Sequence, residues 1–448
     1  MTMNTNQSGP DGHKVPAPAP AGQDDPSLID SPRMRQASAE LLSLALMDAR
    51  NHTLHLFSQF EQAGAQHKSL PASFNNLSAG PSPLWLLGHI GWFQEWWIGR
   101  NMQRAMGTRC EPGHARLSSI EPHADRWWSP SQTGSISDVA DVAHCRAYLL
   151  DTLESTLELL EKAGVHAGAD SDDALYFYRL ALFHEDMQCE VLTSLAQSLG
   201  VPLDKPLRDV FMPPPMALRD PLLIPGTAWQ LGSRTGPGAG FAFDNEKPAH
   251  PADVPAFEID AQPVTWAQYV EFVDDGGYDR EELWHPGGWR WLQSFEDGEG
   301  GEGRRAPRHV DQIGVASGAV MQTRFGQRMR MQGNQPALHV SWWEADAWCR
   351  WAGRRLPFEV EWEIAASTAV RRGFRWGDVW EWTASTFRPY PGFSADPWAD
   401  YSVPAFGARK VLRGASFATR ARMKAPAFRR FELEGRDDLF CGFRSCSL

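Results

Sequence analysis

The chain has 448 residues, which is enough for roughly two or three domains with cores of their own. Apolar residues make up 42% and charged residues 22%, the balance of a folded globular protein, which excludes a disordered or collagen-like chain. The formal net charge of −12 argues against a general nucleic-acid or anionic-membrane surface. No apolar run reaches the ~18 residues that a membrane span needs. We therefore expect neither nucleic acid nor a membrane as a partner.

The first 32 residues are mostly Pro, Ala, Gly, Ser and Asp, with too little apolar content to fold. Residues 1–32 are therefore predicted to be a disordered tail. This segment has no apolar stretch between a basic start and a small-residue cleavage site, so a secretory signal is not expected. The six cysteines are few and scattered, which argues against a disulfide framework and favours a reducing, cytoplasmic location.

Helical periodicity dominates the next part of the chain. Apolar residues recur at spacings of three and four in four segments, at about residues 35–64, 84–97, 137–160 and 172–199. The last segment is followed by Gly200 and Pro202, a typical stop signal for a helix. Four helices of this length predict a four-helix bundle over residues 33–202.

The composition changes after the bundle. Residues 205–233 contain a cluster of prolines that is typical of a strap between domains. Short strand-like runs, many Gly and Trp residues, and only two clear helices follow, at about 265–274 and 341–353. Residues 203–448 are therefore predicted to form an irregular domain with long loops, which gives the chain an α+β fold.

Two histidines of the predicted bundle are candidate metal ligands. His89 and His184 each lie on an amphipathic helix with apolar neighbours on both sides, and bundle metal sites use such inward-facing side chains. Gln188 follows His184 by four residues and shares its helix face, with Glu185, Asp186 and Glu190 nearby. A hydrogen-bonded core histidine is the more common explanation for either residue alone, so the residues by themselves leave both interpretations open.

A family resemblance favours the metal. Residues 333–366, GDVWEWTAS at 377–385, KVLRGASFAT at 410–419 and GFRSC at 442–446 resemble the sulfatase-modifying-factor, formylglycine-generating-type domain, which is C-type-lectin-like. Cys441 and Cys446 do not follow the copper-binding cysteine pattern of the formylglycine-generating enzymes. A DinB-like four-helix bundle joined to such a domain instead resembles the ergothioneine-type sulfoxide synthases. The resemblance covers about residues 38–448.

The resemblance implies an Fe(II) enzyme. Members of this family use O2 to join a sulfur donor to C2 of the imidazole of hercynine, which is trimethylhistidine. GHIGWFQEW is similar to the helix that carries the family's first iron ligand, which implies His89. The family's H-x-x-x-H pair reads His184 and Gln188 here. Three alternatives follow: a two-histidine site helped by Gln188, which we favour, a third ligand from His52 or His55, or a lost metal.

The residues that resemble the family's substrate site depart from its pattern. Trp398 stands where the family has a proton-supplying tyrosine, and Tyr401 or Tyr390 is the nearest replacement. Arg430, Phe431 and Glu432 stand where the family has an Asn-Trp-Asp triplet that binds substrate; the alternative for this charged pair is a solvated surface. No arginine lies between Trp127 and Val139, where related synthases grip the carboxylates of γ-glutamylcysteine.

These departures favour the selenoneine synthases, which share the architecture and hercynine but take selenium from a selenosugar without carboxylates. LLSLALMDARNHTL and EPHADRWW also resemble that branch, and the 20 Trp residues would suit a sugar face and a trimethylammonium group. The predicted partners are therefore hercynine, O2 and a selenosugar or thiol donor. Three alternatives stay open: an ergothioneine-pathway sulfoxide synthase, a thiol dioxygenase, and a catalytically inactive binding homologue.

Overall fold

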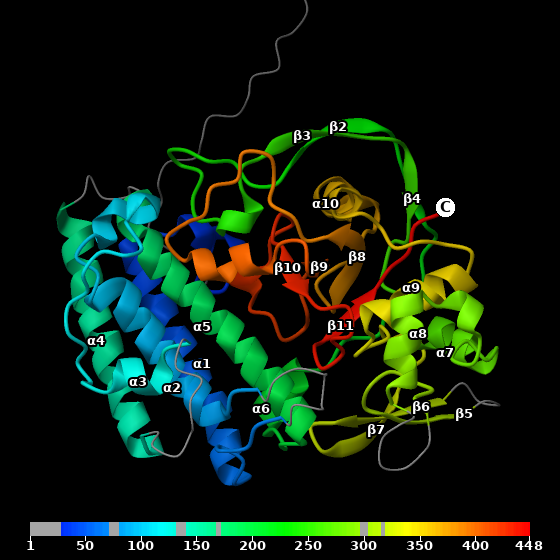
Figure 1. Cartoon of the computed structure of the whole chain (residues 1–448), viewed down its shortest axis with the longest axis horizontal. Coiled ribbons are helices and arrows are strands. Elements are labelled where there is room, and N and C mark those ends of the chain that lie inside the picture. Colours follow the sequence, from blue (N-terminus) through cyan, green and yellow to red (C-terminus); the bar gives the residue numbers. More distant parts are fainter. Residues whose placement is uncertain (1–27, 71–79, 131–139, 167–171, 296–302, 315–318) are drawn as a thin grey trace, which may run out of the picture.

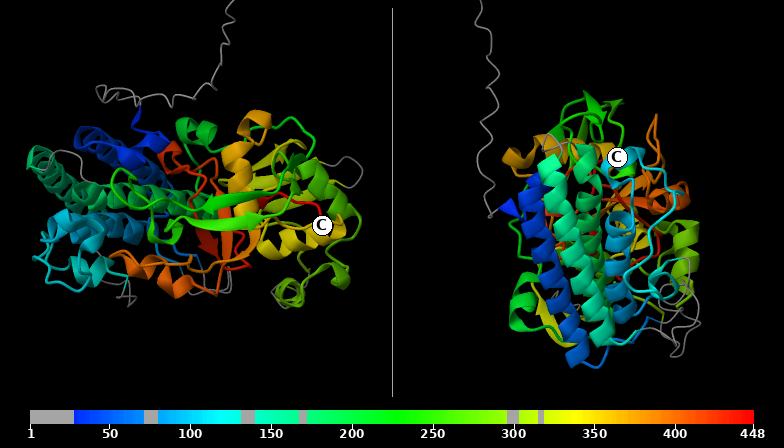
Figure 2. Two further views of the ribbon diagram at one scale, coloured as in Figure 1. Left: turned by 90° about the horizontal axis from the view of Figure 1, so that it is seen from above. Right: turned by 90° about the vertical axis from the view of Figure 1, so that its left-hand side faces the viewer.

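The chain folds into a helical half and a mixed half that lie side by side (Figures 1 and 2). The structure is a computed structural model, and it describes residues 28–70, 80–130, 140–166, 172–295, 303–314 and 319–448. Helix α5 lies on the side of the bundle that faces the second half (Figure 1). The predicted α+β class, with an N-terminal bundle and a C-terminal domain of sheets and short helices, is confirmed.

The bundle consists of four long helices: α1 (Ala39–Gln62), α2 (Pro83–Gln94), α4 (Val142–His166) and α5 (Asp172–Leu199). Serine side chains begin two of them, because the hydroxyls of Ser38 and Ser82 accept hydrogen bonds from first-turn amides. Gly88 lets α2 approach α3 (Ala124–Trp128) closely, since a Cβ there would lie 2.0 Å from the indole nitrogen of Trp128. A π-helical turn, η4 (Glu95–Gly99), continues α2.

The described part of the chain begins at residue 28, before the predicted boundary at residue 33. Most of the predicted tail lies outside the described residues, but Ile29 and Asp30 contact the C-terminal half. The guanidinium of Arg422 donates to the Ile29 carbonyl over 3.0 Å, and the Arg422 amide donates to Asp30 over 2.9 Å. These hydrogen bonds fix residues that composition alone assigns to the tail.

The described residues of the C-terminal half form four small sheets. Their strands are β1 (Leu222–Ile224), β2 (Thr227–Leu231), β3 (His250–Val254), β4 (Phe257–Ile259), β5 (Val310–Gly314), β6 (Ala319–Arg324), β7 (Gln327–Met331), β8 (Trp380–Thr386), β9 (Lys410–Gly414), β10 (Arg430–Glu432) and β11 (Cys441–Phe443). The largest sheet has the order β10-β9-β8-β11, in which only the β8–β11 pair is parallel. The sheet carries Arg430 and Glu432 on β10, which lies next to α5 (Figure 1).

The helices of this half are α6 (Lys205–Val210), α7 (Trp266–Asp274), α8 (Pro286–Gln293), α9 (Trp342–Trp351) and α10 (Glu359–Thr368). Helices α7 and α9 lie where the sequence predicts them, whereas α8 and α10 were not predicted. In α10, acidic and apolar residues alternate as in a strand. The helix forms because its three glutamates are buried against arginines: Glu359 with Arg429, Glu361 with Arg355, and Glu363 with Arg413.

Buried ion pairs join the two halves. The Arg422 guanidinium donates to Asp186 on α5 over 2.7 Å and to Asp48 on α1 over 2.8 Å. Both Arg422 and Asp186 are buried, so removing Arg422 would leave the carboxylate of Asp186 without this partner. All six cysteines are buried and unpaired. None of the described helices is long and apolar enough to cross a membrane.

Candidate active site

The structure brings the two candidate metal ligands together in the bundle core. The imidazole of His89 on α2 and that of His184 on α5 have centroids 5.3 Å apart, with planes at 66°. Burial lowers the pKa of His89 to about 4, and burial together with His89 lowers the pKa of His184 well below its usual value. Both rings are therefore neutral at pH 7, the form that binds a metal.

The tautomer of His89 is fixed by a backbone contact. Its Nδ1 lies 2.9 Å from the carbonyl oxygen of Trp128, which can only accept, so Nδ1 carries the proton. The lone pair is thus left on Nε2, and Trp85 holds the ring by stacking on it at 4.7 Å. A ligand histidine that donates its other N–H to a carbonyl is typical of protein metal sites.

Gln188 lies beside His184, as its place one helical turn later predicts. The two Nε2 atoms are 3.2 Å apart, and a turn of the amide would direct its oxygen to the same place. His55 instead contacts Asp204 over 2.6 Å, and His52 packs against Phe211 at 6.4 Å, so both already have other partners. Within the described ranges, no group of three His, Cys, Asp or Glu residues is arranged to hold a metal ion. The donors fit a two-histidine site with an amide as third ligand.

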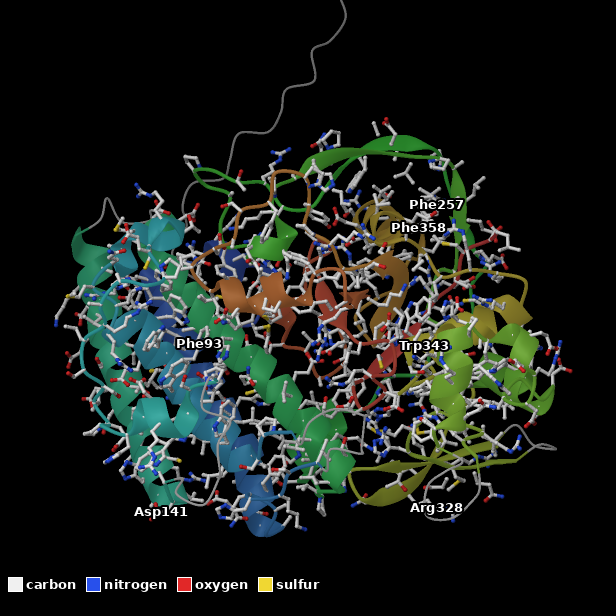
Figure 3. The ribbon with its side chains drawn as sticks, in the orientation of Figure 1. Phe93, Asp141, Phe257, Arg328, Trp343 and Phe358 are labelled. Carbon is white, nitrogen blue, oxygen red and sulfur yellow. The ribbon has the colours of Figure 1, made fainter. Side chains whose placement is uncertain are left out.

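Aromatic rings enclose His184. Phe93, labelled within the bundle in Figure 3, stacks on it with centroids 3.6 Å apart. Trp398 of the C-terminal half meets the same imidazole edge-on at 5.5 Å, and Tyr401 stacks on Trp398 at 4.6 Å. The two predicted aromatic residues are therefore neighbours of the predicted ligand, although more than 200 residues separate them from it.

A cavity of about 240 Å³ lies between α5 and the C-terminal half. Six of the eight predicted site residues line it: Gln188, Trp398, Tyr401, Arg430, Phe431 and Glu432. The other two, His89 and His184, are outside this lining, and His184 contacts two of its members, Gln188 and Trp398. The remaining lining residues are Asp186, Met187, Glu190, Val191, Trp380, Thr419, Met423 and Phe428. One apolar-walled cavity with few charged groups is the usual form of a small-molecule site.

The charges of this cavity are linked across the two halves. The Arg430 guanidinium lies 3.2 Å from Glu432 and 3.6 Å from Glu190 on α5. Glu190 also accepts hydrogen bonds from Thr419 over 2.8 Å and from the Trp380 indole. The sequence places Glu190 on the predicted helix that carries His184, but it does not assign Glu190 to the substrate site. The available signal was its spacing of three and four residues from Met187 and Asp186, which sets all three on neighbouring positions of one face.

Of the two tyrosines considered, only Tyr401 lines the cavity. Its hydroxyl contacts the sulfur of Met187 at 3.8 Å. Burial, with help from Glu246 and Asp244, raises the pKa of Tyr401 above the usual range, so the phenol stays protonated. The Tyr390 hydroxyl instead lies 3.1 Å from the Arg413 guanidinium and 3.3 Å from Glu359.

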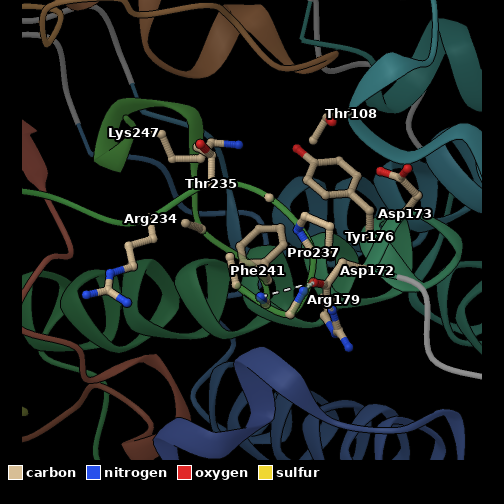
Figure 4. A pocket seen from close by; sticks show the side chains of 15 residues that line it. Thr108, Asp172, Asp173, Tyr176, Arg179, Arg234, Thr235, Pro237, Phe241 and Lys247 are labelled. Atoms are coloured by element: carbon tan, nitrogen blue, oxygen red, sulfur yellow. Dashed lines mark hydrogen bonds and ion pairs between the residues drawn. The ribbon is translucent and has the colours of Figure 1, made fainter. Parts of the chain in front are cut away.

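A second cavity, of about 430 Å³, lies at the N-terminal end of α5 (Figure 4). None of the predicted site residues lines it. Asp172 accepts hydrogen bonds from Arg179 over 2.8 Å and from the Gly238 amide over 3.0 Å. Lys247 is paired with Asp396 at 2.8 Å. Because none of the predicted site residues lines this cavity and six of them line the smaller one, we assign the candidate site to the smaller cavity.

Comparisons with known proteins agree with the two-part architecture. The DinB superfamily matches residues 45–192, and the sulfatase-modifying factor enzyme 1-like domain matches residues 208–378 and 373–447. The hercynine oxygenase of Mycolicibacterium smegmatis is 32% identical and aligns with 90% of this chain and 98% of its own length. That of Mycobacterium tuberculosis is 30% identical, over 91% and 98%. The formylglycine-generating enzyme of Streptomyces coelicolor is 28% identical, over 45% of this chain and 80% of its own.

The two hercynine oxygenases align with both halves of this chain. The formylglycine-generating enzyme aligns with fewer than half of the residues of this chain. The shared features therefore include the combination of the two domains, not the C-terminal domain alone. This chain is an enzyme that belongs to the hercynine oxygenase family.

Proposed function

We propose that the protein uses Fe(II) and O2 to join a selenium or sulfur donor to C2 of the hercynine imidazole, with a neutral selenosugar-type donor preferred. One observation carries the proposal. Two lining residues of the cavity, Gln188 and Trp398, contact the buried His184. The same lining combines a guanidinium, carboxylates and aromatic rings, the groups that recognise a zwitterion with a trimethylammonium group. The hercynine oxygenases among the relatives support the same acceptor.

His89 and His184 would hold the iron, with the amide oxygen of Gln188 as third ligand. Bound iron supplies electron transfer to O2 and a meeting point for the reactants. The chain itself supplies two neutral imidazoles, one of them kept in the binding tautomer by the Trp128 carbonyl. Phe93 and Trp398 cover His184 and keep bulk water from it.

Hercynine would bind with its carboxylate on Arg430 and its trimethylammonium group among aromatic rings. Trp398, Tyr401 and Phe431 line the cavity and offer cation–π contacts worth roughly 0.5–2 kcal/mol each. Glu190 and Glu432 add two carboxylates against the one guanidinium. The net negative lining suits the ammonium end, and Asp186 adds nothing to it because Arg422 neutralises it.

The reaction balances with one O2. Replacing the C2–H bond and the donor's S–H or Se–H bond by a C–S or C–Se bond removes two electrons and two protons. Oxidation of the chalcogen to its monoxide removes two more electrons, so O2 ends as one product oxygen and one water. Tyr401 would donate the proton, because among the described residues it is the one tyrosine that lines the cavity.

A donor without carboxylates is favoured by the charges of the cavity. Among the described residues that line it, Arg430 is the one cationic side chain, and the carboxylate of hercynine would occupy it. Most of the predicted arginine-free stretch after Trp127 lies outside the described residues. A dianionic peptide donor would lack charge-assisted hydrogen bonds worth roughly 1.5–3 kcal/mol each.

The test is a donor comparison with the iron-loaded protein. We expect a neutral selenosugar or thiosugar, with hercynine and O2, to give a product in which the chalcogen is attached to hercynine. The kcat/KM for γ-glutamylcysteine should be at least about tenfold lower, since one missing charged hydrogen bond accounts for that factor. A higher value for γ-glutamylcysteine would instead assign the ergothioneine-pathway sulfoxide synthase. An oxidised thiol with unchanged hercynine would assign a thiol dioxygenase, the alternative that Trp398 in place of a phenol supports.

A further inference from the structure

A second group of chemically active side chains lies inside the C-terminal half, around strand β6. Within the described residues, several of their buried polar atoms find no hydrogen-bond partner. These atoms are Nε and Nη1 of Arg324, Nε2 of His309, Nε2 of His339 and both amide atoms of Gln322. Gln322 and Arg324 share the buried face of β6, and both are at most 1% exposed. Unpaired polar atoms at this depth are rare in folded proteins, because each costs roughly 1–3 kcal/mol.

These side chains are close together. The imidazoles of His309 and His339 have centroids 4.8 Å apart, with planes at 77°. The Arg324 guanidinium lies over the rings of Phe325, Phe417 and Phe440 at 5.2–5.7 Å. The His339 ring lies 5.5 Å from Phe440 as well, so one phenyl ring adjoins both the guanidinium and the imidazoles.

Arg324 is a buried cation whose one hydrogen bond among the described residues goes to a neutral group, the Phe211 carbonyl at 3.0 Å. Burial alone lowers its pKa to about 9, with no carboxylate acting in the opposite direction. The acidic residues beside the two histidines, Asp437 and Asp438, are paired with other arginines. Asp437 accepts from Arg304 and Arg308, and Asp438 accepts from Arg436. A buried guanidinium without an anion is unfavourable by several kcal/mol.

We propose that a small inorganic anion, of the size of a halide ion, binds at this place between Arg324, His309 and His339, with Gln322 beside it. A metal cation would be repelled by the guanidinium, which lowers the pKa of both histidines together with burial and their other charged neighbours. The His339 Nδ1 is bonded to the Asp437 carbonyl at 3.1 Å, so a proton on its Nε2 requires the imidazolium form, which an anion stabilises.

The anion would fasten the junction of the two halves. Residues that flank Arg324 are bonded to the last turns of α5: Gln197 donates to the Thr323 carbonyl over 2.8 Å and accepts from the Phe325 amide over 3.0 Å. Arg324 itself donates to Phe211, which follows α6 in the strap between the halves. A bound anion that balances the charge of Arg324 would therefore stabilise the packing of the β6–β7 hairpin against α5, the helix that carries His184. This inference does not depend on the proposed reaction.

Bromide is the probe, because it replaces chloride and scatters anomalously. Crystals of the full-length protein grown in sodium bromide should show an anomalous peak in contact with Nε or Nη1 of Arg324. In solution at constant ionic strength, Tm should be higher in bromide than in gluconate, an anion too large for the site. Above the dissociation constant we expect about 2–4 °C for each tenfold increase in bromide.

Two matched variants separate the site from general salt effects. Arg324→Met should lose both the peak and the bromide dependence of Tm. Arg328→Met removes the same charge from an exposed position on the same hairpin (Figure 3) and should keep both. If Arg324→Met does not fold, the wild-type crystal still decides. If water or a carboxylate of the chain contacts Arg324 and no anomalous peak is present, the proposal is wrong. A peak without any shift in Tm identifies an adventitious ion only and overturns the proposal as well.

Discussion

Arg430 on β10 and Glu190 on α5 face each other across the boundary between the two halves, with Nη1 and Oε1 3.6 Å apart. Neither half alone contains both residues, so the polar end of the cavity forms only when the bundle and the C-terminal domain are joined. The same helix carries His184 six residues earlier, which is about one and two-thirds turns. Helix α5 therefore links the proposed metal ligands to the proposed substrate-binding groups.

The first prediction concerns the metal ligands. His89→Ala and His184→Ala should each lose stoichiometric iron after anaerobic reconstitution, because each removes one of two imidazole donors. Iron content per chain, measured by mass spectrometry, checks this. His55→Ala is the control, since this histidine is bonded to Asp204 and should retain full iron. Full iron in His184→Ala would show that the ligands lie elsewhere.

The second prediction concerns Gln188. Gln188→His should tighten Fe(II) binding by about tenfold or more, since imidazole is a stronger ligand than an amide for this metal. A competition titration with a chelator measures the change in dissociation constant. Gln62→His, an exposed position on α1, supplies the same residue type away from the site and should have no effect. Equal affinities of wild type and Gln188→His would remove Gln188 from the ligand set.

The third prediction concerns hercynine. Arg430→Ala should raise the KM for hercynine by roughly 10- to 100-fold, the range expected for a lost charged hydrogen bond, with a much smaller effect on the donor. Glu432→Ala should act in the same direction, because a carboxylate that balances the trimethylammonium group is lost. Arg388→Ala, at an exposed position, serves as the control for a lost arginine. Normal hercynine binding by both variants would refute this assignment of the cavity.

Local patterns were sufficient to predict the bundle and the places of its candidate ligands. The helix period places His184 and Gln188 on one face, and the family resemblance points to His89 and to Arg430, Phe431 and Glu432. Long-range contacts were not predictable in this way. Glu190 lines the cavity, where Trp380 on β8 and Thr419 after β9 donate hydrogen bonds to it. Contacts between such distant segments leave no periodic pattern in the sequence.

Helix α10 shows the same limit at the level of secondary structure. Its alternating glutamates have the period of a strand, and arginines that pair with them stabilise the helix. Arg413 and Arg429 come from distant segments, whereas Arg355 lies shortly before the helix. The proposed third metal ligand is a further case. Sequence alone leaves His52 and His55 as candidates, and their contacts with Phe211 and Asp204 become visible only in three dimensions.

The fourth prediction concerns acid stability. Burial, together with Arg420, holds the pKa of His52 at about 4, whereas the unfolded chain titrates near 6.5. Between these values the unfolded state binds more protons, so the free energy of unfolding falls as the pH falls from about 6.5 to about 4. The His52 share is of the order of 2–3 kcal/mol. In urea unfolding, the free energy of unfolding of His52→Gln should fall less than that of wild type between pH 6.5 and pH 4. An equal fall in both proteins would contradict a lowered pKa of His52.

The most direct test of the proposed reaction follows the hydrogen on C2 of the hercynine imidazole. Hercynine deuterated at C2 is incubated with the iron-loaded protein, O2 and a neutral selenosugar or thiosugar. The masses of the products are then measured by mass spectrometry. We predict a product in which the chalcogen is bound to hercynine and the deuterium is gone, in wild type but not in His184→Ala. Hercynine recovered with its deuterium, while O2 and the donor are consumed, would contradict bond formation at this carbon.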